Sequence, residues 1–99
     1  MRYRCGDIIL NTSLAKAKWQ DDTAWNGKYH FSKSSGAIVF YIETLYLSSK
    51  GKYYIERWGI IKGDSSVVII DRKDAAAWLV CNGHELPDDL FVFKGDIEE

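Results

Sequence analysis

Two stretches rich in β-branched and aromatic residues, 37–47 and 52–61, constrain the fold more than any other feature of this sequence. Residues of these types favour strands because their side chains pack well on a pleated surface. The connection Ser48-Ser49-Lys50-Gly51 ends in a glycine, which can take the left-handed conformation that short hairpin loops need. The sequence therefore predicts a long β-hairpin.

A third strand extends this hairpin. The turn residues 62–65 are followed by the apolar segment 66–70, so we expect a three-stranded antiparallel meander within residues 43–70. The first strand carries apolar side chains on both of its faces, whereas a sheet with one solvated face alternates apolar and polar residues. We therefore expect helices, the C-terminal segment or a second protein chain to cover both faces.

A helix is predicted over residues 72–82, directly after the meander. Asp71 precedes it as an N-cap, and the acidic Asp74 suits the positive end of the helix dipole. Gly83 stands where a left-handed C-terminal cap belongs, and Pro87 prevents the helix from resuming. Trp78 and Leu79 are expected to pack on the sheet.

The flanking segments give shorter elements. Residues 3–10 end in an apolar run and predict a short strand, and residues 14–20 are good helix formers behind capping side chains, so they predict a short helix. The pair Asn26-Gly27 predicts a tight type I′ turn. Residues 90–93 predict an edge strand or an apolar clasp.

These elements predict an α+β fold, a small two-layer sandwich in which the antiparallel meander packs with an N-terminal short helix and a C-terminal helix. The 99 residues, 46% of them hydrophobic, fit a single domain over 1–99, with 94–99 as an acidic tail. No apolar run is long enough to span a membrane, and the N-terminus lacks the apolar core of a signal peptide. We therefore expect a cytoplasmic protein that does not contact membranes.

Several blocks of the sequence resemble a family of small uncharacterised bacterial and archaeal proteins, some of which travel with mobile elements. The blocks are Glu43-Thr44-Leu45-Tyr46-Leu47-Ser48-Ser49-Lys50-Gly51-Lys52-Tyr53-Tyr54-Ile55-Glu56, Ala76-Ala77-Trp78-Leu79 and Asn82-Gly83-His84-Glu85-Leu86-Pro87-Asp88-Asp89-Leu90. The segments 5–13 and 16–19 are also similar to the start of such proteins. The function of the family is unknown, so the resemblance implies a setting and assigns no functional residue.

Catalytic and metal-binding patterns are weak. Cys5 and Cys81 are far apart in the sequence and lack the paired spacing of a metal site, so we expect free thiols, no metal and no cofactor. His84 follows the predicted helix, where it can bond to terminal carbonyl groups. A small toxin-like nuclease that uses His30 or His84 with Lys and Tyr side chains is an alternative function.

Basic and aromatic residues interleave on the predicted hairpin, and five of them form the predicted partner-binding surface: Lys50, Lys52, Tyr54, Arg57 and Trp58. Tyr, Trp and Arg anchor protein interfaces, and a net charge of −1 is compatible with a protein partner. The leading hypothesis is a non-enzymatic binding protein, a small stoichiometric regulator or inhibitor that contacts another protein or forms a homodimer. A nucleic-acid-binding module on the same hairpin is the alternative, although such proteins tend to be basic.

Overall fold

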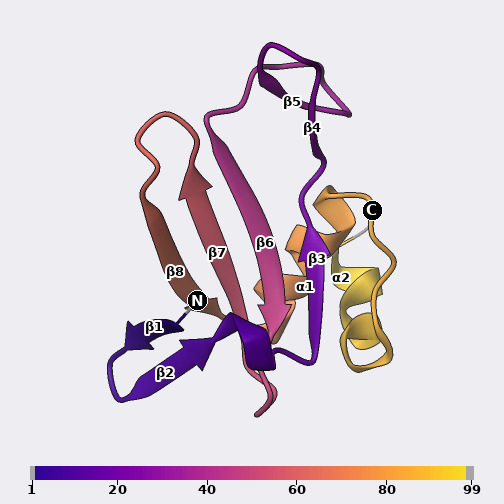
Figure 1. Cartoon of the computed structure of the whole chain (residues 1–99). Helices are drawn as coiled ribbons and strands as arrows, with labels where there is room; N and C mark the ends of the chain where they lie inside the picture. The colour runs from indigo at the N-terminus through magenta and orange to yellow at the C-terminus, as the bar shows by residue number, and fades with distance from the viewer. Residues whose placement is uncertain (1, 98–99) are drawn as a thin grey trace.

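A four-stranded antiparallel sheet organises the computed structural model, which describes residues 2–97. Its strands are β3 (Ala17–Gln20), β6 (Tyr41–Leu47), β7 (Tyr53–Gly59) and β8 (Ser65–Ile70), in the order β3-β6-β7-β8 (Figure 1). The predicted meander of β6, β7 and β8 is confirmed, and the coarse α+β class with it. Gly51 has a φ of 87°, as the predicted loop requires.

The predicted helix over residues 14–20 is wrong. Only one 3₁₀ turn, η1 (Thr12–Leu14), forms there, and β3 follows it as the fourth strand of the sheet. Trp19 pairs with Leu45 of β6 and packs against the buried core, while Lys18 on the other face is exposed. Burial of alternate residues in the ladder outweighs the helix propensity of an Ala- and Lys-rich segment.

Helix α1 (Arg72–Cys81) covers one face of the sheet and confirms the predicted helix over 72–82 to within one residue. The Asp71 side chain accepts a hydrogen bond from the backbone N–H of Asp74 at 2.7 Å, and Gly83 has a φ of 79°. The core beneath the helix consists of Leu45, Tyr53, Ala75, Ala76, Leu79 and Leu90. Trp78 packs partly buried against this core, as expected.

The C-terminal segment forms a clasp and not an edge strand. Leu90 of η2 (Asp88–Phe93) is fully buried beneath α1, and Phe93 packs against the same core. The predicted acidic tail begins with a short helix, α2 (Lys94–Ile97), whose Ile97 also reaches the core. Residues 98 and 99 of that tail lie outside the described residues.

The N-terminal hairpin of β1 (Arg2–Cys5) and β2 (Ile8–Asn11) contacts the opposite face of the sheet. The Tyr3 hydroxyl donates to Glu56 Oε2 at 2.5 Å, and Glu56 lies on the face of β7 that α1 does not cover. Leu10 and Tyr54 are buried outside the main core. The predicted single strand over residues 3–10 is therefore wrong, because Gly6, at a φ of 62°, turns the chain back into a hairpin. α1 with the clasp covers one face of the sheet as expected, and this hairpin, which was not predicted, contacts the other.

A third hairpin, β4 (Thr23–Trp25) and β5 (His30–Ser32), projects beyond the end of the sheet (Figure 1). The turn at Asn26-Gly27 is present, but the predicted type I′ geometry is wrong because Gly27 has a positive φ and Asn26 does not. The Asn26 side chain instead accepts the backbone N–H groups of Lys28 and Tyr29, each at 2.9 Å. No helix within residues 2–97 is long and apolar enough to cross a membrane.

Candidate binding surface

The predicted partner-binding residues do not form one surface. Lys50 and Lys52 are exposed in and beside the loop between β6 and β7, whereas Arg57 and Trp58 lie near the other end of β7. Arg57 is five positions after Lys52 along extended strand, which corresponds to about 17 Å. Arg57 and Trp58 are themselves consecutive, so their side chains point to opposite faces of the sheet.

Tyr54 is fully buried, so the prediction that it is exposed to a partner is wrong. Its ring stacks on Tyr46, with centroids 5.1 Å apart and an interplanar angle of 12°. Burial raises the pKa of Tyr54, and within the described residues its hydroxyl has no hydrogen-bond partner. The sequence shows that Tyr53 and Tyr54 face opposite ways, but not that each face is covered.

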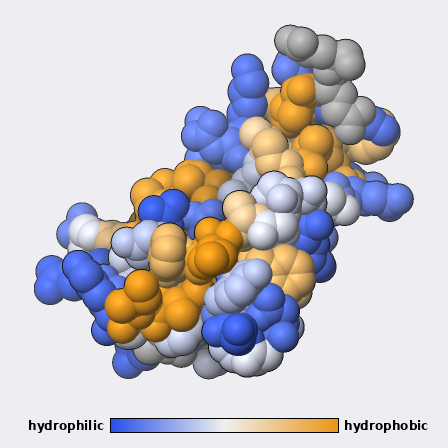
Figure 2. Space-filling model, turned by 90° about the horizontal axis from the view of Figure 1, so that it is seen from above, coloured by the Kyte–Doolittle hydropathy of each residue, from blue (hydrophilic) through white to orange (hydrophobic). Residues whose placement is uncertain are grey.

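Three large apolar side chains, Phe40, Tyr41 and Ile61, are exposed at the end of the sheet nearest the β4–β5 hairpin, and we call them the distal patch. Their exposed fractions are 56%, 52% and 77%. They line a groove of about 320 Å³ together with Gly59, Lys62 and Asp64. Figure 2 looks onto this end of the molecule and shows hydrophobic atoms exposed between hydrophilic ones. The distal patch is therefore apolar with a charged rim.

Gly59 shapes the floor of this groove. Its backbone N–H donates to the carbonyl oxygen of Asp64 at 2.8 Å, and its carbonyl accepts the N–H of Gly63 at 2.8 Å. A Cβ atom at position 59 would overlap the Asp64 carboxylate and contact the Tyr41 ring. The absence of a side chain at Gly59 therefore lets the β7–β8 turn fold back beside Tyr41.

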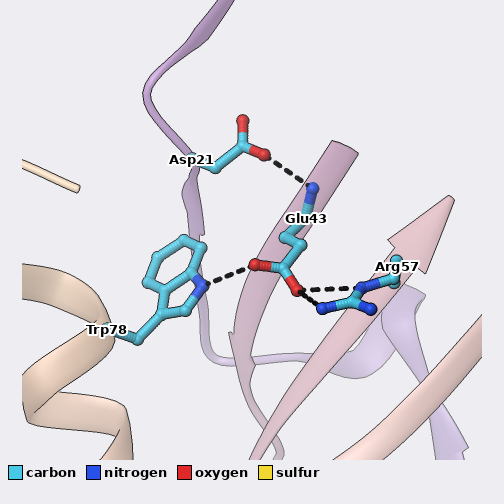
Figure 3. A network of polar contacts seen from close by, with 4 residues as sticks. All are labelled: Asp21, Glu43, Arg57 and Trp78. Carbon is cyan, nitrogen blue, oxygen red and sulfur yellow. Dashed lines mark hydrogen bonds and ion pairs between the residues drawn. The ribbon is translucent and has the colours of Figure 1, made fainter. Parts of the chain in front are cut away.

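Arg57 lies beside the distal patch and is held by a polar network centred on Glu43 (Figure 3). Glu43 Oε2 accepts hydrogen bonds from Arg57 Nε at 3.0 Å and Nη2 at 2.7 Å, and Glu43 Oε1 accepts one from Trp78 Nε1 at 3.2 Å. The backbone N–H of Glu43 donates to Asp21 Oδ2 at 2.7 Å. The guanidinium carbon of Arg57 lies 5.3 Å from the centre of the Tyr41 ring. The network orients Arg57 against an aromatic face.

A second, more polar groove adjoins the first and shares Phe40 and Tyr41 with it. It has a volume of about 370 Å³, and its further lining residues are Asp21, Asp22, Thr23, Val39, Glu43, Arg57 and Asn82. Hydrogen bonds from Ser34 at 2.7 Å and Ser32 at 3.1 Å lower the pKa of Asp22, the Ser34 bond having the larger effect. The end of the sheet thus combines an apolar groove with a neighbouring acidic wall.

The two histidines are engaged separately. His30 packs on Trp25 within the β4–β5 hairpin, with ring centroids 4.9 Å apart. His84 Nε2 lies 2.6 Å from the Gln20 carbonyl oxygen of β3, so its side chain bonds to a strand carbonyl, and only its backbone N–H bonds to the helix terminus, at Leu79. Residues 2–97 contain no group of three or more His, Cys, Asp or Glu side chains that could hold a metal ion.

Comparison with protein-family models, with curated proteins and with solved structures found no match for this chain. The family resemblance of the hairpin and of the helix exit stays a prediction.

Arg57 is the one predicted partner-binding residue that lies beside the distal patch, and the three apolar residues of the distal patch were not predicted. One signal was available for Ile61, because the apolar residues of the stretch 52–61 continue past Gly59 to the turn at residues 62–65. Phe40 and Tyr41 are of residue types that are usually buried in strands. Their exposure therefore follows only from where α1 and the β1–β2 hairpin end.

Proposed function

We propose that this protein is a non-enzymatic binding protein, a small stoichiometric regulator or inhibitor that contacts a protein partner through the distal patch. The observation that carries the proposal is the exposure of Phe40, Tyr41 and Ile61 around one groove, beside an arginine that is already oriented. Exposed contiguous apolar surface on a small domain indicates an interaction site. Aromatic residues and arginine are the residue types enriched at the centre of protein interfaces.

The distribution of charge supports a protein partner over nucleic acid. A nucleic-acid surface needs several cations that contact successive phosphates. Lys50 and Lys52 lie at the far end of β7 from Arg57, and the Arg57 charge is paired with Glu43 at 2.7 Å. The neighbouring groove is lined by Asp21 and Asp22, which would repel phosphates.

The size and lining of the groove indicate which side chains the partner would place in it. Its apolar lining and its volume of about 320 Å³ suit one or two aliphatic or aromatic side chains. Lys62 and Asp64 at its rim can make polar contacts of either sign, and the N–H groups of Arg57 that Glu43 does not hold can donate to a carbonyl group of the partner. The partner segment is therefore expected to present an apolar anchor flanked by polar groups.

An affinity capture with matched variants tests the proposal. The bait is the full chain as wild type, as Ile61→Glu and as Lys50→Glu/Lys52→Glu, with bound proteins identified by mass spectrometry and their binding then repeated with purified components. Ile61 is 77% exposed, so the glutamate leaves the fold intact while it adds a charge to the apolar groove. We expect wild type and the double lysine variant to retain the same partner and Ile61→Glu to lose it.

Fluorescence anisotropy with single- and double-stranded DNA and RNA, at low and at physiological salt, tests whether the protein binds nucleic acid instead. Salt-sensitive binding that disappears in Lys50→Glu/Lys52→Glu and persists in Ile61→Glu would replace the proposal with the nucleic-acid alternative. Degradation of a probe by substoichiometric protein, abolished by His30→Ala or His84→Ala, would replace it with the nuclease alternative.

A further inference from the structure

The end of the sheet opposite the distal patch carries a groove that the proposed function does not use. It lies between β2 with η1 on one side and the loop from β6 to β7 on the other (Figure 1), and its lining falls within residues 7–14 and 48–52. We call it the proximal groove. Its volume is about 250 Å³, and it shares no residue with the two grooves beside the distal patch.

The wall of the proximal groove that β2 and η1 provide is largely apolar. Ile9 of β2 is 57% exposed and Leu14 of η1 is 64% exposed, whereas Leu10 is buried and anchors the hairpin. Apolar side chains around a concave site are the usual lining for the apolar part of a small ligand. This wall therefore suits an alkyl chain.

The opposite wall is polar, and its own hydrogen bonds hold it in one shape. The N–H of Ser48 donates to the Lys52 carbonyl oxygen at 2.8 Å, and the N–H of Gly51 donates to the Ser48 carbonyl oxygen at 3.0 Å. The N–H of Lys52 donates to Ser48 Oγ at 2.9 Å. Lys50 lies in the middle of this closed loop, so its backbone is already positioned before a ligand binds, which lowers the cost of binding.

The charge of the lining is positive. Lys50 and Lys52 are exposed, and within residues 2–97 neither of them pairs with a carboxylate. Asp7 is the one carboxylate among the described lining residues, so two lysines and one aspartate give a net charge of +1. The proximal groove is therefore complementary to an anion.

The uncharged polar side chains of the proximal groove also offer hydrogen-bond donors. Asn11 Oδ1 accepts the backbone N–H of Ser13 at 3.0 Å, and Ser48 Oγ accepts the backbone N–H of Lys52. Because the backbone occupies these acceptors, the amide hydrogens of Asn11 and the hydroxyl hydrogen of Ser48 are left to donate. A carboxylate accepts such bonds and makes stronger ones than a neutral acceptor does.

We propose that the proximal groove binds a medium-chain aliphatic carboxylate. The alkyl chain of this ligand lies against Ile9 and Leu14, and its carboxylate accepts hydrogen bonds from Lys50 and Lys52. A volume of about 250 Å³ is just below the range of pockets for drug-sized ligands, so it suits a molecule of about ten non-hydrogen atoms. For a ligand of this size we expect a dissociation constant on the order of 1 mM.

This inference goes beyond the proposed function and can fail separately from it, because the distal patch and the proximal groove lie at opposite ends of the sheet. The variant Lys50→Glu/Lys52→Glu is expected to keep the protein partner of the distal patch and to lose the carboxylate. The two results therefore come from one variant and are read independently.

A titration of the full chain, followed by the NMR shifts of its backbone amides, tests the site with three matched probes. Octanoate carries the proposed negative charge, octanamide has a neutral head on the same alkyl chain, and octylammonium has a positive one. We expect octanoate to shift amides within residues 8–14 and 48–52. Octanamide should bind at least tenfold more weakly, and octylammonium should leave these amides unshifted.

Three variants locate the interaction. Lys50→Glu/Lys52→Glu reverses the charge of the polar wall, and Leu14→Glu places a negative charge on the apolar wall at an exposed position. We expect each to weaken octanoate binding at least tenfold. Lys28→Glu/Lys33→Glu is the matched control, since it makes the same change in net charge at two exposed lysines near the β4–β5 hairpin, and it should bind octanoate like wild type. The dispersion of the NMR spectrum establishes that each variant folds.

Several results would overturn the proposal. They are a wild type without shifts at about 20 mM octanoate, octanamide that binds as tightly as octanoate, shifts centred on the distal patch, and a folded Lys50→Glu/Lys52→Glu that binds octanoate unchanged. A short peptide with a free C-terminal leucine that binds at least tenfold more tightly than octanoate would also overturn it, because the occupant would then be the end of a peptide.

Discussion

Trp78 Nε1 donates a hydrogen bond to Glu43 Oε1 at 3.2 Å and so links the middle of α1 to β6. The same carboxylate holds Arg57 through its other oxygen, at 2.7 Å from Nη2. One side chain of the helix is therefore connected, through Glu43, to the arginine that lies beside the distal patch. The packing that stabilises the fold and the geometry of the candidate site share this contact.

Truncation of Trp78 tests the stabilising half of this connection. Trp78→Ala removes a partly buried indole from the core beneath α1, and we expect the free energy of unfolding to fall by about 3 kcal/mol. Trp78→Phe keeps most of the packing and loses the hydrogen bond to Glu43, which costs about 1 kcal/mol. Urea denaturation measures both values. Trp25→Ala is the matched control, since Trp25 is exposed and lies in the projecting hairpin. Equal losses from Trp25→Ala and Trp78→Ala would contradict the assigned packing.

The adjacent tyrosines of β7 are expected to respond in opposite directions to loss of the hydroxyl group. The Tyr53 hydroxyl donates to Asp89 Oδ2 at 2.8 Å, so Tyr53→Phe removes a bond and destabilises the protein by about 1 kcal/mol. The buried Tyr54 hydroxyl has no partner within the described residues, so Tyr54→Phe removes an unsatisfied group and stabilises by about 1 kcal/mol. Chemical denaturation of both variants checks the contrast, and a destabilised Tyr54→Phe would refute it.

Stability is expected to decrease in alkali because of Tyr46. Burial, with a smaller contribution from Glu56, raises the pKa of Tyr46 from 10.0 to about 12. A phenol whose pKa is higher in the folded state contributes stability that is complete below pH 10 and is lost as the pH rises toward about 12. Tyr46→Phe should flatten the dependence of the unfolding midpoint on pH in this window. An unchanged alkaline slope would show that Tyr46 does not carry the effect.

Asp22 is expected to contribute to the loss of folding stability at low pH. Its pKa lies below the ordinary value of 3.8, chiefly because Ser34 donates a hydrogen bond to it. A carboxyl whose pKa is lowered by folding contributes stability that is complete above pH 3.8 and is lost as the pH falls through the folded-state pKa. Asp22→Asn should therefore reduce the loss of stability on acidification, measured by thermal unfolding. Ser34→Ala should act in the same direction, and no effect from either variant would count against this contact.

The parts of the fold that the sequence predicts are those fixed by local chemistry. The meander follows from long runs of β-branched and aromatic residues, and α1 from the N-cap Asp71 and from Gly83 at a φ of 79°. Residues 14–20 were wrongly predicted as a helix because their local preference is overridden by pairing with β6, more than twenty residues further along the chain. No local signal reports that pairing.

In the candidate site, too, residue type was predictable from the sequence, whereas exposure depends on the assembled fold. Arg57 was predicted from its residue type and its place on the hairpin. The burial of Tyr54 depends on how the opposite face of the sheet is covered, where the β1–β2 hairpin lies about fifty residues earlier in the sequence. The exposure of Phe40 and Ile61 depends on where α1 and that hairpin end, which is a property of the assembled layers.

The affinity of the captured partner for two variants decides whether the distal patch is the binding surface. Titration calorimetry compares wild type with Ile61→Glu and with Lys50→Glu/Lys52→Glu, each first confirmed to be folded. We expect Ile61→Glu to weaken binding at least tenfold, a change of about 1.4 kcal/mol, and the double lysine variant to bind within about twofold of wild type. A partner that binds Ile61→Glu as tightly as wild type and loses affinity for the double lysine variant would contradict it.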